Sequence, residues 1–202
     1  MMKKWVFILF FLSFFSNANA QDESAVEISF DFGFTGLNGA ENIGLLFNLE
    51  PRLKFTNNTA MGLRFGVTAN SLAYRNADTL QFHINEISGN GVISIIPTFE
   101  YYFNEKDFHP FAGLGLGPYL LASFLDVTEY YTPENPTTLH EVHVKDQWGV
   151  LLRGGMQSQK IRLTFECNWV TAGDIILPNG KKAGSVQPSY YALSAGFAIR
   201  GK

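Results

Sequence analysis

Hydrophobic and polar residues alternate along most of the sequence after residue 25. The first segment shows the pattern: its apolar positions are Val26, Ile28, Phe30, Phe32 and Phe34, and the positions between them are Glu27, Ser29, Asp31, Gly33 and Thr35. Because successive side chains of a β-strand point to opposite faces, this alternation predicts a strand with one wholly apolar face. The pattern recurs seven more times. It predicts eight strands, at about 26–35, 45–55, 61–68, 93–103, 112–120, 148–157, 161–169 and 190–200.

The connections between these strands alternate between short and long. Three are short and polar, and they lie at 56–59, 104–107 and 158–160. The other four are longer, at about 35–43, 70–90, 122–147 and 171–188. In an up-and-down barrel this order places every long loop at one end and both termini at the other, as in barrels that span bacterial outer membranes.

Alternation alone does not tell which face is outside, and a soluble ligand-binding barrel would turn its apolar face inward. An eight-stranded barrel has little room inside for the many Phe and Trp side chains of that face. The polar face also carries only one lysine, Lys54, and is rich in glycine, which does not suit a surface in water. Its glycines are Gly62, Gly66, Gly113, Gly115, Gly117, Gly149, Gly155 and Gly196. The predicted fold is therefore an all-β, eight-stranded, antiparallel, up-and-down transmembrane β-barrel with its apolar face toward lipid.

Pro51, Pro97 and Pro118 fall inside three of the predicted strands. Proline has no N–H for the hydrogen-bond ladder and normally marks an edge, a strand start or a bulge. We expect bulges or near-interface positions at all three.

The first twenty residues differ from the rest of the chain. Lys3 and Lys4 precede an apolar run at 5–15, and Ala18-Asn19-Ala20 precedes Gln21. This order is typical of a secretory signal peptide with its cleavage site. The sequence thus predicts a cleaved signal peptide at 1–20 and one β-barrel domain at 21–202.

Composition narrows the function classes. The chain has 15 basic and 18 acidic residues, a formal net charge of −3, which argues against a nucleic-acid-binding surface. A single cysteine, Cys167, cannot form an internal disulfide or a cysteine-based zinc site.

Four segments resemble a known family: LEPRLKFTNNTAMGLRFG (49–66), IIPTFEYYF (95–103), HPFAGLGLGPYLL (109–121) and SYYALSAGFAIRGK (189–202). They look like the small outer-membrane β-barrel family of Bacteroidota-type bacteria, which is related to the OmpA/OmpX-type barrels. The resemblance covers nearly the whole chain after the signal peptide. It implies integral outer-membrane localisation, contact with outer-membrane lipid and lipopolysaccharide, and insertion by the barrel assembly machinery. Members often end in an aromatic residue, whereas the last aromatic residue here is Phe197.

The polar face carries charges of both signs, which we expect to form a lumen ion-pair network. Its acids are Glu27, Asp31, Glu50, Glu100 and Glu166, and its bases are Arg52, Lys54, Arg64, Arg153, Arg162 and Arg200. Charges in a narrow lumen must be paired or solvated because an isolated buried charge is costly. The network is either a selective pore or a plug of ion pairs, and the small lumen of eight strands favours the plug.

Aromatic residues lie at both ends of the predicted strands. Phe55, Phe103 and Phe108 are at the short-turn end, and Trp148 and Trp169 are at the long-loop end. We interpret them as membrane-interface aromatics, which form girdles at the two edges of a transmembrane barrel. The alternative is that strands are simply rich in aromatic residues.

Candidate chemistry is sparse. The glycines of Gly113-Leu114-Gly115-Leu116-Gly117 follow strand periodicity and lack the following helix of a nucleotide loop. His140-Glu141-Val142-His143 offers too few ligands for a metal site. Outer-membrane lipid A deacylases and palmitoyltransferases use a His with Ser and an acid near the outer rim, and His83, His109, His140 and His143 do not show that arrangement.

We therefore expect no catalytic, cofactor-binding or metal residues and no enzymatic activity. The predicted function is that of an integral outer-membrane barrel with a structural or surface-interaction role, with four extracellular loops and no nucleic-acid partner. Two alternatives stay open: a small-solute, porin-like channel and a lipid-modifying enzyme. The sequence does not identify an extracellular ligand.

Overall fold

The structure is a computed structural model. It describes residues 26–37, 43–69, 73–76, 82–84, 90–104, 108–123, 127–132, 135–139, 143–158, 160–176, 180 and 182–200. The predicted signal peptide at 1–20 lies outside these residues and stays a prediction.

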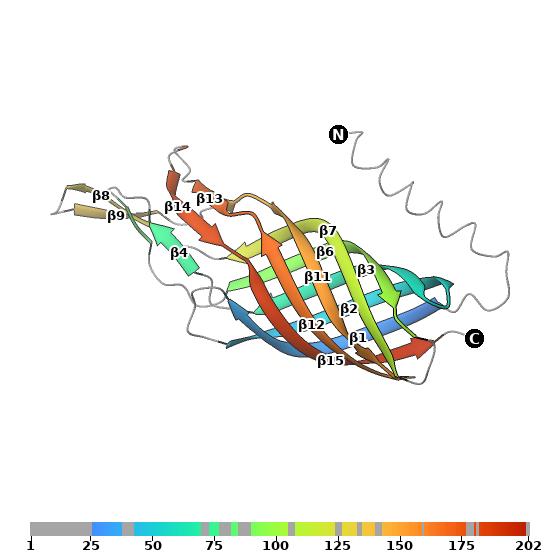
Figure 1. The fold of residues 1–202 in the computed structure, drawn as a ribbon. Helices are drawn as coiled ribbons and strands as arrows, with labels where there is room; N and C mark the ends of the chain where they lie inside the picture. The colour runs from blue at the N-terminus through green and yellow to red at the C-terminus, as the bar shows by residue number, and fades with distance from the viewer. Residues whose placement is uncertain are drawn as a thin grey trace.

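Eight long strands form a closed antiparallel barrel (Figure 1). Each pairs with its two neighbours around the ring, in the order β1-β15-β12-β11-β7-β6-β3-β2, and the β1–β2 pairing closes it. The strands are β1 (Val26–Leu37), β2 (Ile43–Thr56), β3 (Thr59–Ala69), β6 (Asn90–Tyr102), β7 (His109–Ser123), β11 (Gln147–Gln157), β12 (Ile161–Val170) and β15 (Tyr190–Arg200). The predicted eight-stranded up-and-down barrel is confirmed.

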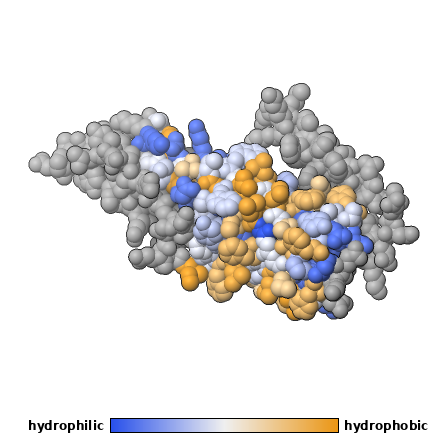
Figure 2. All heavy atoms as spheres, in the orientation of Figure 1, coloured by the Kyte–Doolittle hydropathy of each residue, from blue (hydrophilic) through white to orange (hydrophobic). Residues whose placement is uncertain are grey.

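The apolar face of each strand points outward. In β12, exposed Leu163 and Phe165 alternate with buried Arg162, Thr164 and Glu166. The outer surface is correspondingly apolar, and Figure 2 shows hydrophobic residues spread over the side of the barrel turned to the viewer. Exposed Phe, Leu and Ile in such numbers are stable in lipid rather than in water, so this is a membrane-spanning barrel. Among the described residues, no helix is long and apolar enough to cross a membrane.

Short turns join the strands at one end. In the β2–β3 turn, Asn58 Nδ2 donates to the Tyr102 carbonyl at 2.8 Å, which ties the turn to β6. In the β11–β12 turn, the Ser158 N–H donates to the Ile161 carbonyl at 2.8 Å. β1 begins and β15 ends at this same end (Figure 1).

The long connections at the other end contain strands of their own, which the alternating pattern did not predict. These are β4 (Ala73–Asn76), β5 (Phe82–Ile84), β8 (Val127–Thr132), β9 (Asn135–Leu139), β10 (His143–Val144), β13 (Gly173–Ile176) and β14 (Lys182–Gln187). They form a sheet in the order β10-β13-β14-β4 and a second sheet in the order β5-β8-β9. Figure 1 shows β4, β8, β9, β13 and β14 beyond the barrel wall. Most of these strands are too short to show the alternation that marks a strand in a sequence.

The three prolines do not mark bulges. The β2–β3 register is the same before and after Pro51, from Leu49↔Phe65 to Arg52↔Gly62, and shifts only between Lys54 and Thr56. Pro97 and Pro118 also lie in ladders of constant register. The β2–β3 ladder omits Glu50 and Pro51, and the β6–β7 ladder omits the pairings between 95–97 and 116–118, but no residue is inserted at these gaps.

Candidate functional site

The lumen collects the charged residues that the alternation assigned to the inner face. Nine of them are buried: Glu27, Asp31, Glu50, Glu100, Glu166, Arg52, Arg64, Arg153 and Arg162. They come from β1, β2, β3, β6, β11 and β12, which are spread around the ring, so closure of the barrel brings them together.

Glu100 is the centre of the larger group, here termed the Glu100 cluster, and contacts three arginines. Arg52 Nη1 lies 3.0 Å from Glu100 Oε2, and Arg153 Nη2 lies 2.9 Å from Glu100 Oε1. Arg162 also forms an ion pair with this carboxylate. Tyr102 donates its hydroxyl to Glu100 Oε2 at 2.8 Å. Three cations thus share one acid, and two of them also contact a second acid.

Those second acids are Glu27 and Glu50. Arg52 Nη2 lies 2.5 Å from Glu27 Oε1. Arg153 approaches Glu50 with both terminal nitrogens, at 2.7 and 2.6 Å, which is the strong bidentate geometry. Thr98 donates to Glu50 Oε1 at 2.5 Å.

Glycine makes room for these long side chains. A Cβ at Gly62 would lie 2.5 Å from Glu50 Oε1 and 2.8 Å from Arg52 Cγ. A Cβ at Gly113 would lie 3.0 Å from Glu100 Cγ and 3.3 Å from Arg153 Cγ. The inward-facing glycines of β3 and β7 therefore leave space for the arginine and glutamate side chains of the neighbouring strands.

A second group, the Arg64 cluster, pairs Arg64 with Glu166. Arg64 Nη2 lies 2.8 Å from Glu166 Oε2, and Arg64 Nη1 donates to Ser94 Oγ at 3.0 Å. The Tyr190 hydroxyl lies 3.4 Å from Arg64 Nη2, and Asn48 Nδ2 donates weakly to Glu166 Oε1 at 3.4 Å. Buried Tyr119 donates to Asn168 Oδ1 at 2.7 Å.

An apolar cluster closes the loop end of the lumen. It reaches from the barrel wall to Val186 of β14, and partly buried Leu121 and Val144 pack against it. Its buried members are Leu46, Val92, Ile96, Tyr119, Leu151, Val170, Val186, Tyr190 and Ala192. The sequence analysis did not predict this closure. The available signal was that Leu46, Ile96 and Leu151 stand at inward positions of the alternating pattern.

Three predicted network residues differ from the others. Asp31 is buried on β1, but its Oδ1 accepts no hydrogen bond among the described residues. Lys54 is half-buried with its Nζ 5.0 Å from the centre of the Tyr102 ring. Arg200 ends β15, and its side chain lies outside the described part of the chain.

Other lumen residues were not predicted. Arg162 stacks on Phe111 with its guanidinium carbon 3.8 Å from the ring centre, and Gln157 donates to Glu27 Oε1 at 2.8 Å. Phe111 lies on the inner face of β7, where Ala60 and Tyr102 pack with it.

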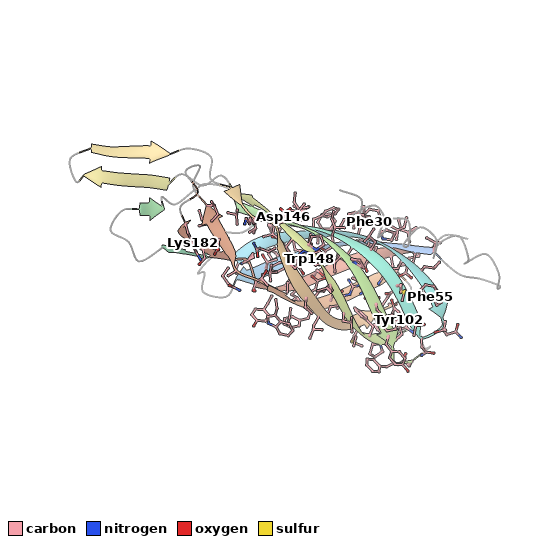
Figure 3. The ribbon with its side chains drawn as sticks, turned by 90° about the horizontal axis from the view of Figure 1, so that it is seen from above. Phe30, Phe55, Tyr102, Asp146, Trp148 and Lys182 are labelled. Atoms are coloured by element: carbon pink, nitrogen blue, oxygen red, sulfur yellow. The ribbon has the colours of Figure 1, made fainter. Side chains whose placement is uncertain are left out.

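The five interface aromatics are all exposed on the outside of the barrel. Phe55 lies at the end of β2 next to a short turn, and Figure 3 shows it near Tyr102 at that end, with Lys182 at the other. Phe103 and Phe108 flank the β6–β7 turn. Trp148 is the second residue of β11 and Trp169 the second-last residue of β12, both at the loop end.

Within the described part of the chain, no group of three or more His, Cys, Asp and Glu could hold a metal ion. His140 and Glu141 lie outside the described residues, and so do the side chains of His83 and His143.

Comparison with known proteins gives the fold. No protein-family model matches the sequence, and no curated protein matches it. Among solved structures, the outer membrane protein OprG from Pseudomonas aeruginosa has a TM-score of 0.51 at 13% identity, over 88% of this chain and 97% of that one. A major outer membrane protein from Thermus thermophilus has a TM-score of 0.47 at 14% identity, over 88% of this chain and 100% of that one. The chain therefore has the fold of the small bacterial outer-membrane barrels.

Proposed function

We propose that the protein is an integral outer-membrane barrel with a closed lumen, which anchors extracellular β-structure in a structural or surface-interaction role. The observation that carries the proposal is the set of ion pairs that cross the barrel interior.

Two of these pairs join opposite walls. In the ring of eight strands, β3 and β12 lie four places apart, and so do β2 and β11. Arg64 of β3 pairs with Glu166 of β12, and Arg153 of β11 pairs with Glu50 of β2. An eight-stranded barrel is just wide enough to be filled by side chains, so pairs across its diameter occupy the axis.

The apolar cluster adds a second closure at the loop end. A solute entering from outside would have to displace buried Val92, Leu151 and Val186 before it reached the ion pairs. The two closures differ in chemistry, so no single class of solute would pass both easily. This arrangement supports an anchoring barrel over a porin-like channel.

The β-structure beyond the barrel is the part that an anchored role would present. Its two sheets combine strands from three different long connections. Such pairing gives the connections a defined shape that separate flexible loops would not have. The exposed residues described on β13 and β14 are polar: Lys182 Nζ lies 2.6 Å from Asp174 Oδ1, both side chains are half exposed, and Gln187 is exposed as well. We propose contact with lipid and lipopolysaccharide around the barrel and with an external partner at these sheets.

We propose no enzymatic activity. The described acids and bases of the lumen mostly neutralise one another, and a lipid-modifying enzyme would need reactive groups at the outer rim, on the lipid side.

Two measurements test the proposal. The first is steady conductance in planar bilayers, which we expect to be negligible for the unaltered protein; large, stable single-channel steps would contradict the closed lumen and favour the channel.

The second measurement tests orientation with a membrane-impermeant maleimide on intact cells, in a Cys167→Ser background. Lys182→Cys lies in the loop sheet and should be labelled. Asn57→Cys lies in the β2–β3 turn and should be labelled only after cell lysis. The reverse pattern would place the sheets inside the periplasm and refute the anchored role.

A further inference from the structure

Asp31 is a buried acid of the lumen that forms no ion pair within the described part of the chain. It projects from β1 into the lumen and is 3% exposed. Glu27, Glu50, Glu100 and Glu166 each form an ion pair with an arginine. Those pairs involve four glutamates and four arginines, so this set is neutral by itself. Asp31 adds one negative charge to it.

The arginines near Asp31 are already engaged. Arg162, Arg52 and Arg153 are close enough to attract its carboxylate, and Glu50 is close enough to repel it. Each of these arginines forms an ion pair with Glu100, and Arg52 and Arg153 also pair with Glu27 and Glu50.

The remaining basic side chain that is described in the lumen is too far along the barrel. Asn48 is the residue of β2 opposite Asp31. Lys54 stands six residues farther along β2, about 20 Å at the rise of a strand, with its ammonium group at the Tyr102 ring.

The surroundings of Asp31 supply oxygen ligands. Ser29 is two residues away on the same face of β1, and Ser194 stands two residues before Gly196, the residue of β15 opposite Asp31. The hydroxyls of Ser29 and Ser194 are buried, and neither has a hydrogen-bond partner among the described residues. Buried polar atoms of this kind normally contact a bound water or ion.

Gly196 shapes the site. A Cβ at this position would overlap the Asp31 carboxylate, so the absence of a side chain lets Asp31 lean across β15. The inner wall here is built of small residues, among them Ala192 and Ala198, in contrast to the arginine-filled interior beside it.

We propose that Asp31 binds one monovalent alkali cation inside the barrel, with water molecules bridging the cation to the Ser29 and Ser194 hydroxyls on either side. Carboxylate, hydroxyl and water oxygens are the ligands of hard cations. One carboxylate neutralises a single positive charge, whereas a divalent ion would leave a net positive charge buried next to Arg52 and Arg162. The site does not depend on the role of the loop sheets or on whether the lumen conducts.

The test compares thermal unfolding of the refolded protein in detergent with NaCl, KCl or LiCl against N-methylglucamine chloride at equal ionic strength. At least one alkali cation should raise the Tm of the unaltered protein, by an amount that grows with cation concentration as for a bound ligand. Asp31→Asn should raise the Tm in N-methylglucamine chloride and abolish the cation dependence.

Glu166→Gln is the matched control, because it makes the same acid-to-amide change at a carboxylate that is paired with Arg64. It should lower the Tm in every salt and keep the cation dependence. If Asp31→Asn does not fold, Ser29→Ala and Ser194→Ala take its place, and each should weaken the cation dependence.

Several outcomes would overturn the site. One is an unaltered protein whose Tm is the same in all four salts. Another is a cation dependence that survives unchanged in Asp31→Asn, or in both serine variants. An infrared carbonyl band of a protonated carboxylic acid, present in the unaltered protein with NaCl and lost in Asp31→Asn, would show that a proton occupies the position instead.

Discussion

Replacing Glu100 with glutamine removes the acid that three arginines share. Glu100→Gln keeps the shape of the side chain but removes its charge. Arg52 keeps Glu27 and Arg153 keeps Glu50. Among the described residues, Arg162 keeps direct hydrogen bonds only to neutral acceptors, Gln157 Oε1 at 2.9 Å and Thr164 Oγ1 at 3.2 Å, while the Asp31 carboxylate attracts it without a direct ion pair. Arg162 is therefore the arginine of this cluster that loses its direct ion pair.

The expected cost follows from that change. Removing one partner of a buried ion pair typically costs about 3–5 kcal/mol, because the other charge stays buried without compensation. Arg162 is fully buried and stacks on Phe111, so it has no route to water short of opening the barrel. We expect the free energy of unfolding of Glu100→Gln to fall by about 3 kcal/mol or more.

The assay is urea unfolding in lipid vesicles, followed by tryptophan fluorescence and by heat-modifiable mobility in SDS gels. Lys182→Ala is the control: it removes a half-exposed ion pair with Asp174 and should cost about 0–1 kcal/mol. Arg162→Met in the Glu100→Gln background should recover part of the loss, because it removes the stranded charge. A Glu100→Gln loss no larger than that of Lys182→Ala, or a double variant less stable than the sum of its single changes, would refute this reasoning.

Three other predictions concern the lipid face, the axis and processing. Leu163→Arg should lower barrel stability by about 2–4 kcal/mol in vesicles, since arginine at the bilayer midplane carries that cost; normal insertion and stability would invert the assignment of the faces. The double variant Arg64→Ala/Glu166→Ala should stay closed in planar bilayers, because the Arg153–Glu50 pair and the apolar cluster still block the axis, and a steady leak from it would show that Arg64 and Glu166 alone keep the lumen closed. Mass analysis of the membrane-bound protein should find an N-terminus at Gln21, and an intact Met1 there would defeat the predicted cleavage.

Alternation predicted the barrel because lipid and lumen impose opposite requirements on consecutive residues. Once Leu163 faces lipid, Thr164 must face inward, and this holds along each of the eight long strands. The short turns could be predicted for a related reason: segments such as Asn57-Asn58 contain no apolar residues, so they interrupt the alternating pattern. The loop sheets could not be found in this way, because β4, β5 and β10 are too short for a period to show.

The partners inside the lumen could not be predicted either. Alternation places Arg64 and Glu166 on the inner face, but their contact depends on the stagger between strands that are far apart in the sequence. That stagger depends on the register of every pair of neighbouring strands between them, and a shift of one residue in any of these registers would change it. Asp31 shows the same limit: its inward direction follows from the pattern, while the pairing of the nearby arginines with other acids follows from the ring as a whole.

The lumen is divided into a charged part and an apolar part, and this division affects the strength of the ion pairs. A surface ion pair is weakened by dissolved salt, and buried pairs are screened much less. The apolar cluster from Leu46 to Val186 lies on the loop side of Arg64 and Glu166 and separates this ion pair from the external solution on that side. The same exclusion raises the cost of any charge left unpaired, because the interior then has a low dielectric constant. The closure that strengthens the ion pairs of the four glutamates is thus also what makes the fifth acid, Asp31, require a positive charge of its own.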